Sequence, residues 1–174
     1  MKALVVYESM FGNTEAVARA IAEGLGDRLG VDVCEVSQAP TAAIGPVHLI
    51  VVGGPTHAFS LSRPATRASA IEQGATHGRK ELGLREWLGH LGRGAHSELV
   101  AVFDTRVDKA RRLPGSAATK AAKAAHALGY APAGKNSFYV RDTAGPLLPG
   151  ELARAKAWGA HLALETSQRD KVER

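Results

Sequence analysis

The chain alternates between short apolar runs and longer segments in which apolar residues recur every three or four positions. Residues 3–7, 49–53 and 99–103 are almost entirely apolar, which is typical of strands buried on both faces of a parallel sheet. Two further strands are predicted at residues 31–36 and 137–140. The pattern therefore predicts five strands.

Segments with a helical period lie between these runs. Val17, Ile21 and Leu25 recur every four positions and predict one amphipathic helix. Ser116 is a suitable N-cap and Gly129 a suitable stop for an alanine-rich helix. The predicted helices cover residues 14–29, 64–73, 84–91, 117–128 and 151–165. Strands that alternate with helices predict an α/β fold: a doubly wound five-stranded parallel sheet with helices on both faces.

Composition supports one folded unit. The chain has 174 residues, of which 45% are hydrophobic and 22% charged, which is ordinary for a globular protein. We expect a single domain over residues 1–174. No stretch is long and apolar enough for a membrane span. Cys34 is the only cysteine, so an internal disulfide is excluded and a cytoplasmic location is expected.

The charge balance narrows the choice of partner. The formal net charge is +5, but aromatic residues make up only 5% of the chain, so no stacking platform for single-stranded nucleic acid is visible. An acidic protein partner or a phosphorylated small molecule is favoured over nucleic acid. No histidine pair has the spacing of a zinc-binding helix, so no metal site is predicted.

The segment after the first predicted strand carries the strongest signal for function. It covers residues 8–14 and reads Glu-Ser-Met-Phe-Gly-Asn-Thr, and a helix is predicted to follow at once. Free N–H groups and the helix dipole favour an anion at such a helix N-terminus. Ser9, Asn13 and Thr14 add side-chain donors, and Gly12 permits a tight turn. The segment lacks both the Walker loop for nucleoside triphosphates and the glycine fingerprint for dinucleotides.

A phosphate held by hydroxyls and amides without a cation is the pattern of flavodoxins, and this segment resembles the flavodoxin phosphate loop. The resemblance implies FMN as cofactor, a strand order of 2-1-3-4-5, and ligand loops after the first, third and fourth strands. It extends over nearly the whole chain, since residues 53–59 and 103–106 are similar to the second and third flavin loops. The implied cofactor-binding residues are Ser9, Met10, Phe11, Gly12, Asn13, Thr14, Pro55, Thr56, His57, Ala58, Phe59, Asp104, Thr105 and Arg106.

The sequence departs from the family pattern at two places. Flavodoxins commonly stack the flavin ring between aromatic residues of the second and third loops, but here only the second loop offers rings, those of His57 and Phe59. His57 is either a ligand contact or an exposed loop residue. The third loop carries Arg106, where the family usually has acidic surroundings. Arg106 is either a cation beside the flavin or a surface residue paired with Asp104 or Asp108.

The resemblance implies an FMN-binding redox protein of the flavodoxin family that exchanges electrons with a partner protein. The sequence does not choose between an electron carrier and a small flavin-dependent reductase, and it indicates no catalytic residue. The alternative is a flavodoxin-fold module with weak or no flavin binding that acts through protein–protein contacts. The basic run Lys109, Arg111 and Arg112 suits an acidic redox partner, the 2′-phosphate of NADPH, or a solvated loop.

Overall fold

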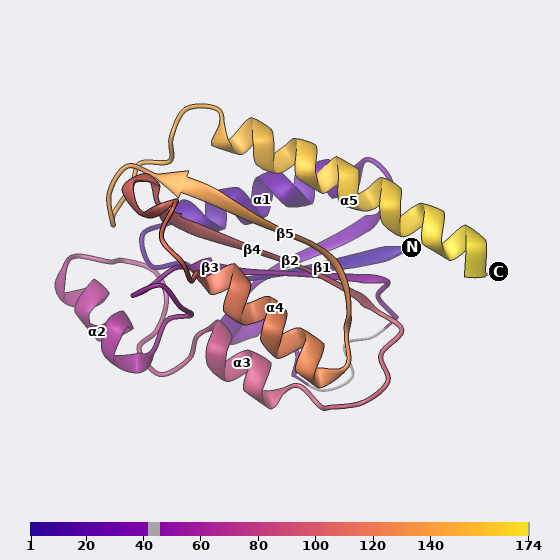
Figure 1. Cartoon of the computed structure of the whole chain (residues 1–174), viewed down its shortest axis with the longest axis horizontal. Helices are drawn as coiled ribbons and strands as arrows, with labels where there is room; N and C mark the ends of the chain where they lie inside the picture. Colours follow the sequence, from indigo (N-terminus) through magenta and orange to yellow (C-terminus); the bar gives the residue numbers. More distant parts are fainter. Residues whose placement is uncertain (42–45, 174) are drawn as a thin grey trace.

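Five parallel strands form the sheet that the apolar runs predict. The computed structural model describes residues 1–41 and 46–173. The strands lie in the order β2-β1-β3-β4-β5 (Figure 1), and every neighbouring pair is parallel. They are β1 (Lys2–Tyr7), β2 (Gly30–Glu35), β3 (Leu49–Pro55), β4 (Leu99–Val107) and β5 (Ala131–Val140). The predicted α/β fold class and strand order are confirmed.

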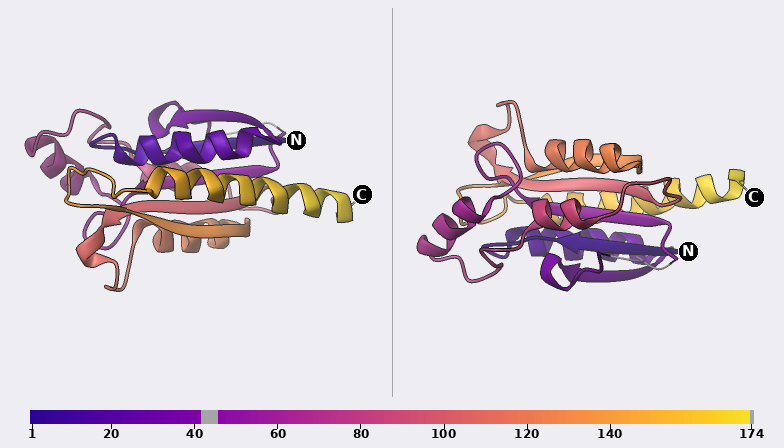
Figure 2. Two further views of the ribbon diagram at one scale, coloured as in Figure 1. Left: turned by 90° about the horizontal axis from the view of Figure 1, so that it is seen from above. Right: turned by 90° about the horizontal axis from the view of Figure 1, so that it is seen from below.

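Helices cover both faces of the sheet (Figures 1 and 2). One face carries α1 (Asn13–Gly26) and α5 (Glu151–Glu173), and the other carries α3 (Leu84–His90) and α4 (Ala117–Leu128). Two 3-10 turns, η1 (Val36–Gln38) and η2 (Asp108–Ala110), follow β2 and β4. A further helix, α2 (Pro64–Glu72), lies beyond the carboxyl ends of the strands.

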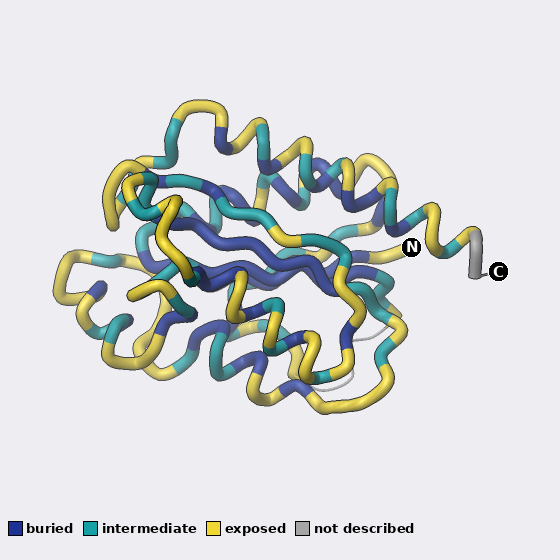
Figure 3. The backbone as a smooth tube through the Cα atoms, in the orientation of Figure 1, coloured by how far each residue is buried: buried dark blue, intermediate teal, exposed yellow. Residues whose placement is uncertain are grey.

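Burial follows from this layering. The inner strands β1, β3 and β4 are buried along almost their whole length, whereas the edge strands β2 and β5 are not (Figure 3). Successive residues of an inner strand serve opposite cores: Ile50 packs with α3 and α4, and Val51 packs with α1 and α5. The inner strands are therefore the rigid support on which the loops at their carboxyl ends are placed.

The element boundaries differ from the predicted ones mainly at β4 and β5. The strand β4 continues four residues past Phe103, because the polar residues that end the apolar run are themselves buried. The strand β5 begins at Ala131, six residues before the predicted start at residue 137. The prediction missed this first half because Pro132 and Gly134 interrupt the apolar pattern of a strand. The predicted caps of α4 are confirmed: the Ser116 hydroxyl accepts a hydrogen bond from the Thr119 N–H group, and Gly129 has a positive φ.

The crossing of α1 and α5 leaves no room for a side chain. A Cβ atom on Gly24 would lie 2.0 Å from the carbonyl oxygen of Lys156, and one on Gly159 would lie 2.1 Å from that of Ile21. The two helices run side by side over the sheet (Figure 2). Their close approach therefore depends on a glycine in each helix.

Candidate cofactor site

Two adjoining cavities lie at the carboxyl ends of β1, β3 and β4. The larger, of about 340 Å³, lies among the loop after β3, the end of β4 and α2. The smaller, of about 70 Å³, extends to the N-terminus of α1. They share the lining residues Thr56, His57, Arg106, Val107 and Thr143, so they form one continuous site. The larger volume alone falls within the roughly 300–1,000 Å³ of small-molecule sites.

The first loop leads into the N-terminus of α1, which offers free N–H groups. Gly12 is the N-cap of α1 and has a φ of 85°, a conformation that glycine adopts without steric cost. The Ser9 hydroxyl accepts a hydrogen bond of 3.1 Å from the Gly12 N–H group and so holds the turn. The N–H groups of the first helical turn have no carbonyl partner within the helix, and the helix dipole places partial positive charge there. The loop can therefore hold an anion without a lysine or arginine.

A buried pair of hydroxyls joins the first loop to the third. Thr14 Oγ1 and Thr105 Oγ1 lie 2.7 Å apart, and both residues line the smaller cavity. Two hydroxyls carry two hydrogens, and the bond between them uses only one. One O–H group of the pair is thus free to donate to an oxygen in the cavity.

Asn13 connects the first loop to the loop after β5. Its Nδ2 atom donates a hydrogen bond of 3.0 Å to the carbonyl oxygen of Ala144, and one amide hydrogen remains for another acceptor. The same loop brings Thr143 into both cavities. Asn13 was predicted only as a donor to a phosphate, and it also positions this fourth loop.

The second loop contains a strained turn at the rim of the larger cavity. His57 and Ser60 exchange two backbone hydrogen bonds, of 2.9 and 3.0 Å. The residues between them, Ala58 and Phe59, have φ values of 46° and 61°. A turn of this kind normally carries Asn and Gly, and a side chain there costs roughly 1–2 kcal/mol per residue. Both residues line the larger cavity. Backbone strain of this kind is typical of ligand sites.

We expect the Ala58→Asn, Phe59→Gly double variant to be more stable than the native chain and to bind FMN more weakly. Relief of the strain should raise the free energy of unfolding by about 1–2 kcal/mol, measured by urea denaturation. Loss of the Phe59 ring should weaken FMN binding by roughly 0.5–1.5 kcal/mol. Phe59→Ala is the control, since it removes the ring and keeps the positive φ. A double variant that binds FMN as tightly as the native chain would show that Phe59 does not contact the flavin.

His57 lies where the two cavities meet. Its Nδ1 atom is 3.0 Å from the Thr66 hydroxyl of α2. Burial lowers the pKa of His57, and the nearby Arg67 guanidinium lowers it further, so the ring is neutral at pH 7 and offers one donor and one acceptor. Its half-buried position excludes the alternative of an exposed loop histidine.

Asp104 supports the site from beneath instead of lining it. Its carboxylate is fully buried, and Oδ2 accepts hydrogen bonds from the Ala118 N–H group (2.8 Å) and the Thr56 hydroxyl (3.2 Å). Thr56 Oγ1 in turn accepts from the Ala117 N–H group at 2.9 Å. Asp104 and Thr56 therefore fix the second loop against the N-terminus of α4, and Asp104 is a positioning residue.

Arg106 is a buried cation at the site. Only 8% of the residue is exposed, and its Nη2 atom donates to the carbonyl oxygens of Ala110 (2.5 Å) and Leu113 (3.1 Å). The predicted alternative of a surface arginine paired with Asp104 or Asp108 is wrong: Asp108 pairs with Arg111 at 3.0 Å instead. Arg106 lines both cavities, and its Nε atom is buried without a hydrogen-bond partner in the part of the chain that the structure describes.

A buried carboxylate directly precedes the first loop. Glu8 Oε1 accepts from the Ser62 hydroxyl (2.5 Å), and Oε2 accepts from the Leu84 N–H group (2.7 Å). The fully buried Arg67 of α2 donates to the same Ser62 hydroxyl (2.7 Å) and lies 2.9 Å from Glu86. Burial raises the pKa of Glu8. This network anchors α2 beside the first loop, and no sequence motif indicated it.

Eleven of the fourteen residues implied by the resemblance line the two cavities. They are Met10, Phe11, Asn13, Thr14, Pro55, Thr56, His57, Ala58, Phe59, Thr105 and Arg106. The other three, Ser9, Gly12 and Asp104, shape or support the loops. The structure adds Val107 and Val140 from the ends of β4 and β5, Ala110 from η2, Thr143 from the loop after β5, and Thr66, Ser69, Ala70 and Gln73 from α2 and the residue after it.

Residues 1–41 and 46–173 offer neither a metal site nor a membrane-spanning helix. No group of three or more His, Cys, Asp or Glu residues in these ranges could hold a metal ion. None of the helices there is long and apolar enough to cross a membrane.

Many solved structures with the same architecture are flavodoxins. A flavodoxin from the domain Archaea has a TM-score of 0.64 and 19% identity, and the match covers 96% of this chain and 99% of that one. Flavodoxin 2 from Bacillus cereus has a TM-score of 0.65 and 18% identity over 95% and 99% of the two chains. The flavodoxin of Streptococcus pneumoniae TIGR4 matches at 0.65 and 17% over 95% and 99%. The fold is flavodoxin-like. No family model and no curated protein matches the sequence.

The flavodoxin-like fold here has aromatic rings on one side of the larger cavity only. Of the described aromatic residues, Phe59 and His57 line it from the second loop, while Val107 and Ala110 lie on the side of the third. Phe11 lines the adjoining smaller cavity from the first loop, and both tryptophans pack elsewhere: Trp87 is buried under the sheet and Trp158 packs on Phe138. The expected departure from two-sided stacking is thus present in the folded chain.

Proposed function

We propose that the chain is a redox protein of the flavodoxin family that binds FMN across the two cavities. The observation that carries the proposal is the first loop, a helix N-terminus with free N–H groups and spare hydroxyl donors at the carboxyl edge of a flavodoxin-like sheet. Its donor set suits a phosphate group. When bound, the flavin supplies the electron chemistry, and the protein binds and orients it and tunes its potential.

Each loop has a distinct part in the proposed site. The first loop and the Thr14–Thr105 pair hold the phosphate. The second loop places Phe59 and the neutral His57 against one side of the flavin ring, and the buried guanidinium of Arg106 supplies a positive charge at the same cavity. We infer a cytoplasmic protein that exchanges electrons with a partner protein, in keeping with its single cysteine.

The visible absorption spectrum of the purified protein tests this proposal. We expect a yellow protein, or one that turns yellow when FMN is added and the excess is removed by gel filtration. Bound FMN should take up electrons from dithionite and return to its oxidised spectrum in air. A colourless protein that retains no FMN after gel filtration contradicts the proposal.

Loss of a phosphate-loop hydroxyl should weaken FMN binding selectively. We expect Thr14→Ala to cost about 1–3 kcal/mol of FMN affinity, the range for hydrogen bonds to charged groups. Ser9→Ala should also weaken FMN binding, because the Ser9 hydroxyl holds the turn that presents the free N–H groups. Riboflavin, which lacks the phosphate, is the matched control and should bind the variants as it binds the native chain. Equal losses for the two ligands in a fluorescence titration would show damage to the fold instead of a lost phosphate contact.

One observation favours a second function. Because the described rings that line the larger cavity, those of His57 and Phe59, both come from the second loop, this cavity has less to hold a flavin ring than one lined by rings from two loops. A flavodoxin-fold module that acts through protein contacts fits this feature. This second function predicts that the chain folds normally, retains no FMN and binds another protein.

A further inference from the structure

The positive charge of the chain is concentrated in one continuous segment. Residues 105–135 contain seven lysines and arginines but a single acidic residue, Asp108, and so carry a formal charge of +6. The whole chain carries +5, so all other residues together carry −1. This segment comprises the end of β4, η2, α4 and the first half of β5. The basic character of the protein is therefore a property of one region.

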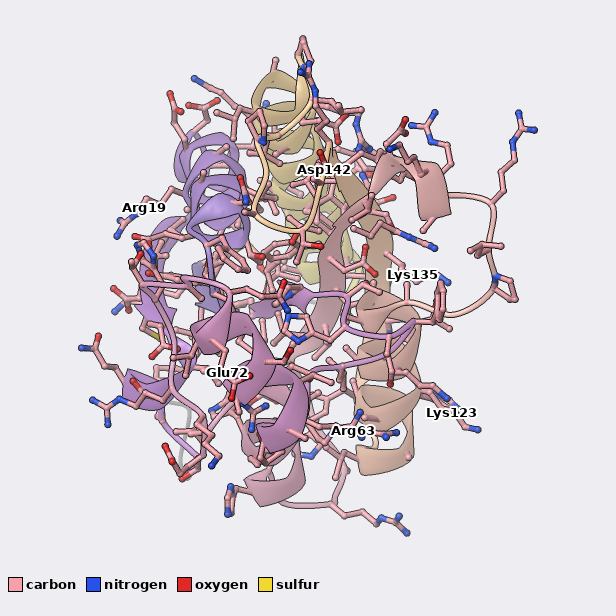
Figure 4. All side chains as sticks on the ribbon, turned by 90° about the vertical axis from the view of Figure 1, so that its left-hand side faces the viewer. Arg19, Arg63, Glu72, Lys123, Lys135 and Asp142 are labelled. Atoms are coloured by element: carbon pink, nitrogen blue, oxygen red, sulfur yellow. The ribbon has the colours of Figure 1, made fainter. Side chains whose placement is uncertain are left out.

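Five of these seven cations lie on the surface without a charged partner. They form what we call the basic face: Lys109, Arg112, Lys120, Lys123 and Lys135, all of which are exposed. The Lys135 ammonium donates weakly to the neutral Thr119 hydroxyl at 3.5 Å, and the side chains of the other four have no hydrogen bond or ion pair with any described residue. Lys123 and Lys135 lie on the α4 side of the molecule, opposite Arg19 of α1 (Figure 4). Uncompensated like charges repel one another, so this arrangement does not stabilise the fold.

The basic face adjoins two exposed apolar side chains, which we call the apolar rim. Leu113, next to Arg112, is 49% exposed, and Phe59, which lines the larger cavity, is 47% exposed. The two loops touch, because a Cβ atom on Gly115 would lie 2.7 Å from the carbonyl oxygen of Phe59. Exposed apolar side chains edged by charges of one sign have the composition of a protein-binding surface.

We propose that the basic face, together with Leu113 and Phe59, is the docking surface for an acidic protein. The partner presents carboxylates to the five cations and an apolar side chain to the rim. A protein is favoured over nucleic acid because the surface offers apolar contact but no row of aromatic rings for stacked bases. The docking itself does not depend on FMN; that it brings a redox partner to the cavity rests on the proposed function.

Charge reversal on the basic face tests the proposal. The variant is Lys109→Glu, Lys120→Glu, Lys123→Glu, and the control is Arg28→Glu, Arg93→Glu, Lys171→Glu, which changes the net charge equally at exposed residues of other regions. The probe is a fluorescein-labelled peptide of Glu and Asp with one central Phe, followed by anisotropy at low salt. We expect the basic-face variant to lose at least about tenfold in affinity and the control variant less than about threefold.

Two further measurements distinguish the kinds of partner. Replacing the central Phe of the peptide by Gly should weaken its binding to the native chain, and Leu113→Ser should remove that difference. A labelled oligothymidylate should bind more weakly than the peptide at physiological salt. Equal losses in the two triple variants would overturn the proposal, and tighter binding of the oligonucleotide would replace it with a nucleic-acid surface. Running each titration with and without added FMN separates failure of this proposal from failure of FMN binding.

Discussion

Gly159→Ala and Gly24→Ala are each expected to lower the free energy of unfolding by about 1–3 kcal/mol, the cost of overpacking a close contact. The new methyl group would lie 2.1 or 2.0 Å from a backbone carbonyl oxygen of the opposite helix. Backbone cannot rotate away as a side chain can, so α1 and α5 must separate. Alanine normally stabilises a helix relative to glycine by about 1 kcal/mol, so the expected loss is opposite in sign to the propensity effect.

Gly26→Ala is the matched control for this prediction. Gly26 also lies in α1, and no atom lies within 4 Å of the position its Cβ would take. It should leave the stability unchanged or raise it slightly. The double variant at Gly24 and Gly159 should lose less than the sum of the single losses, because one separation of the helices relieves both contacts. Urea denaturation of the four variants measures their free energies of unfolding. Stability that rises in Gly24→Ala would contradict the close approach of the helices.

Arg106→Ala is expected to lower the potential of the second one-electron reduction of bound FMN by on the order of 100–150 mV. A unit charge about 5 Å from the reduced, anionic ring contributes roughly 3 kcal/mol at an effective dielectric constant near 20, and about 1.4 kcal/mol corresponds to roughly 59 mV for one electron. The structure supports the premise, because Arg106 is buried and lines both cavities, and no acidic side chain among the described residues pairs with it.

Two further variants distinguish the effect of the Arg106 charge on the potential from an effect of altered loop structure. Arg106→Lys keeps the charge and should retain most of the native potential, although it loses the hydrogen bonds to Ala110 and Leu113. Arg112→Ala removes an exposed cation from the same loop and should shift the potential far less, because water screens it. Spectroelectrochemical titration gives all the potentials. An unchanged potential in Arg106→Ala would show that this arginine does not tune the flavin.

The sequence predicted the sheet and the first loop because their signals are local. A run of apolar residues indicates a buried strand, and a Gly-Asn-Thr segment between a strand and a helix indicates a helix N-terminus. Placement of the second and third loops followed from the family resemblance and from the rule that ligands bind at the carboxyl edge of a parallel sheet. Thr143 could have been included by the same rule, because the loop after β5 ends at that edge.

The remaining features depend on contacts that no local pattern encodes. Asp104 and Arg106 are both polar and lie two residues apart at the end of β4. The Asp104 carboxylate nevertheless bonds to the N-terminus of α4, whereas Arg106 lines the site. The anchoring of α2 depends on Glu8 and Arg67, which are separated along the chain and joined through Ser62. The strained turn at Phe59 was invisible because its conformation normally requires Asn and Gly.

The most direct measurement of the central claim is a fluorescence titration of the flavin-free protein with FMN and, separately, with riboflavin. We expect FMN fluorescence to change saturably with a dissociation constant in the micromolar range or below. We expect riboflavin to bind at least about tenfold more weakly, because it lacks the phosphate that we propose the first loop recognises. No saturable change with FMN, or equal affinity for the two flavins, would contradict the assignment of the first loop as a phosphate site.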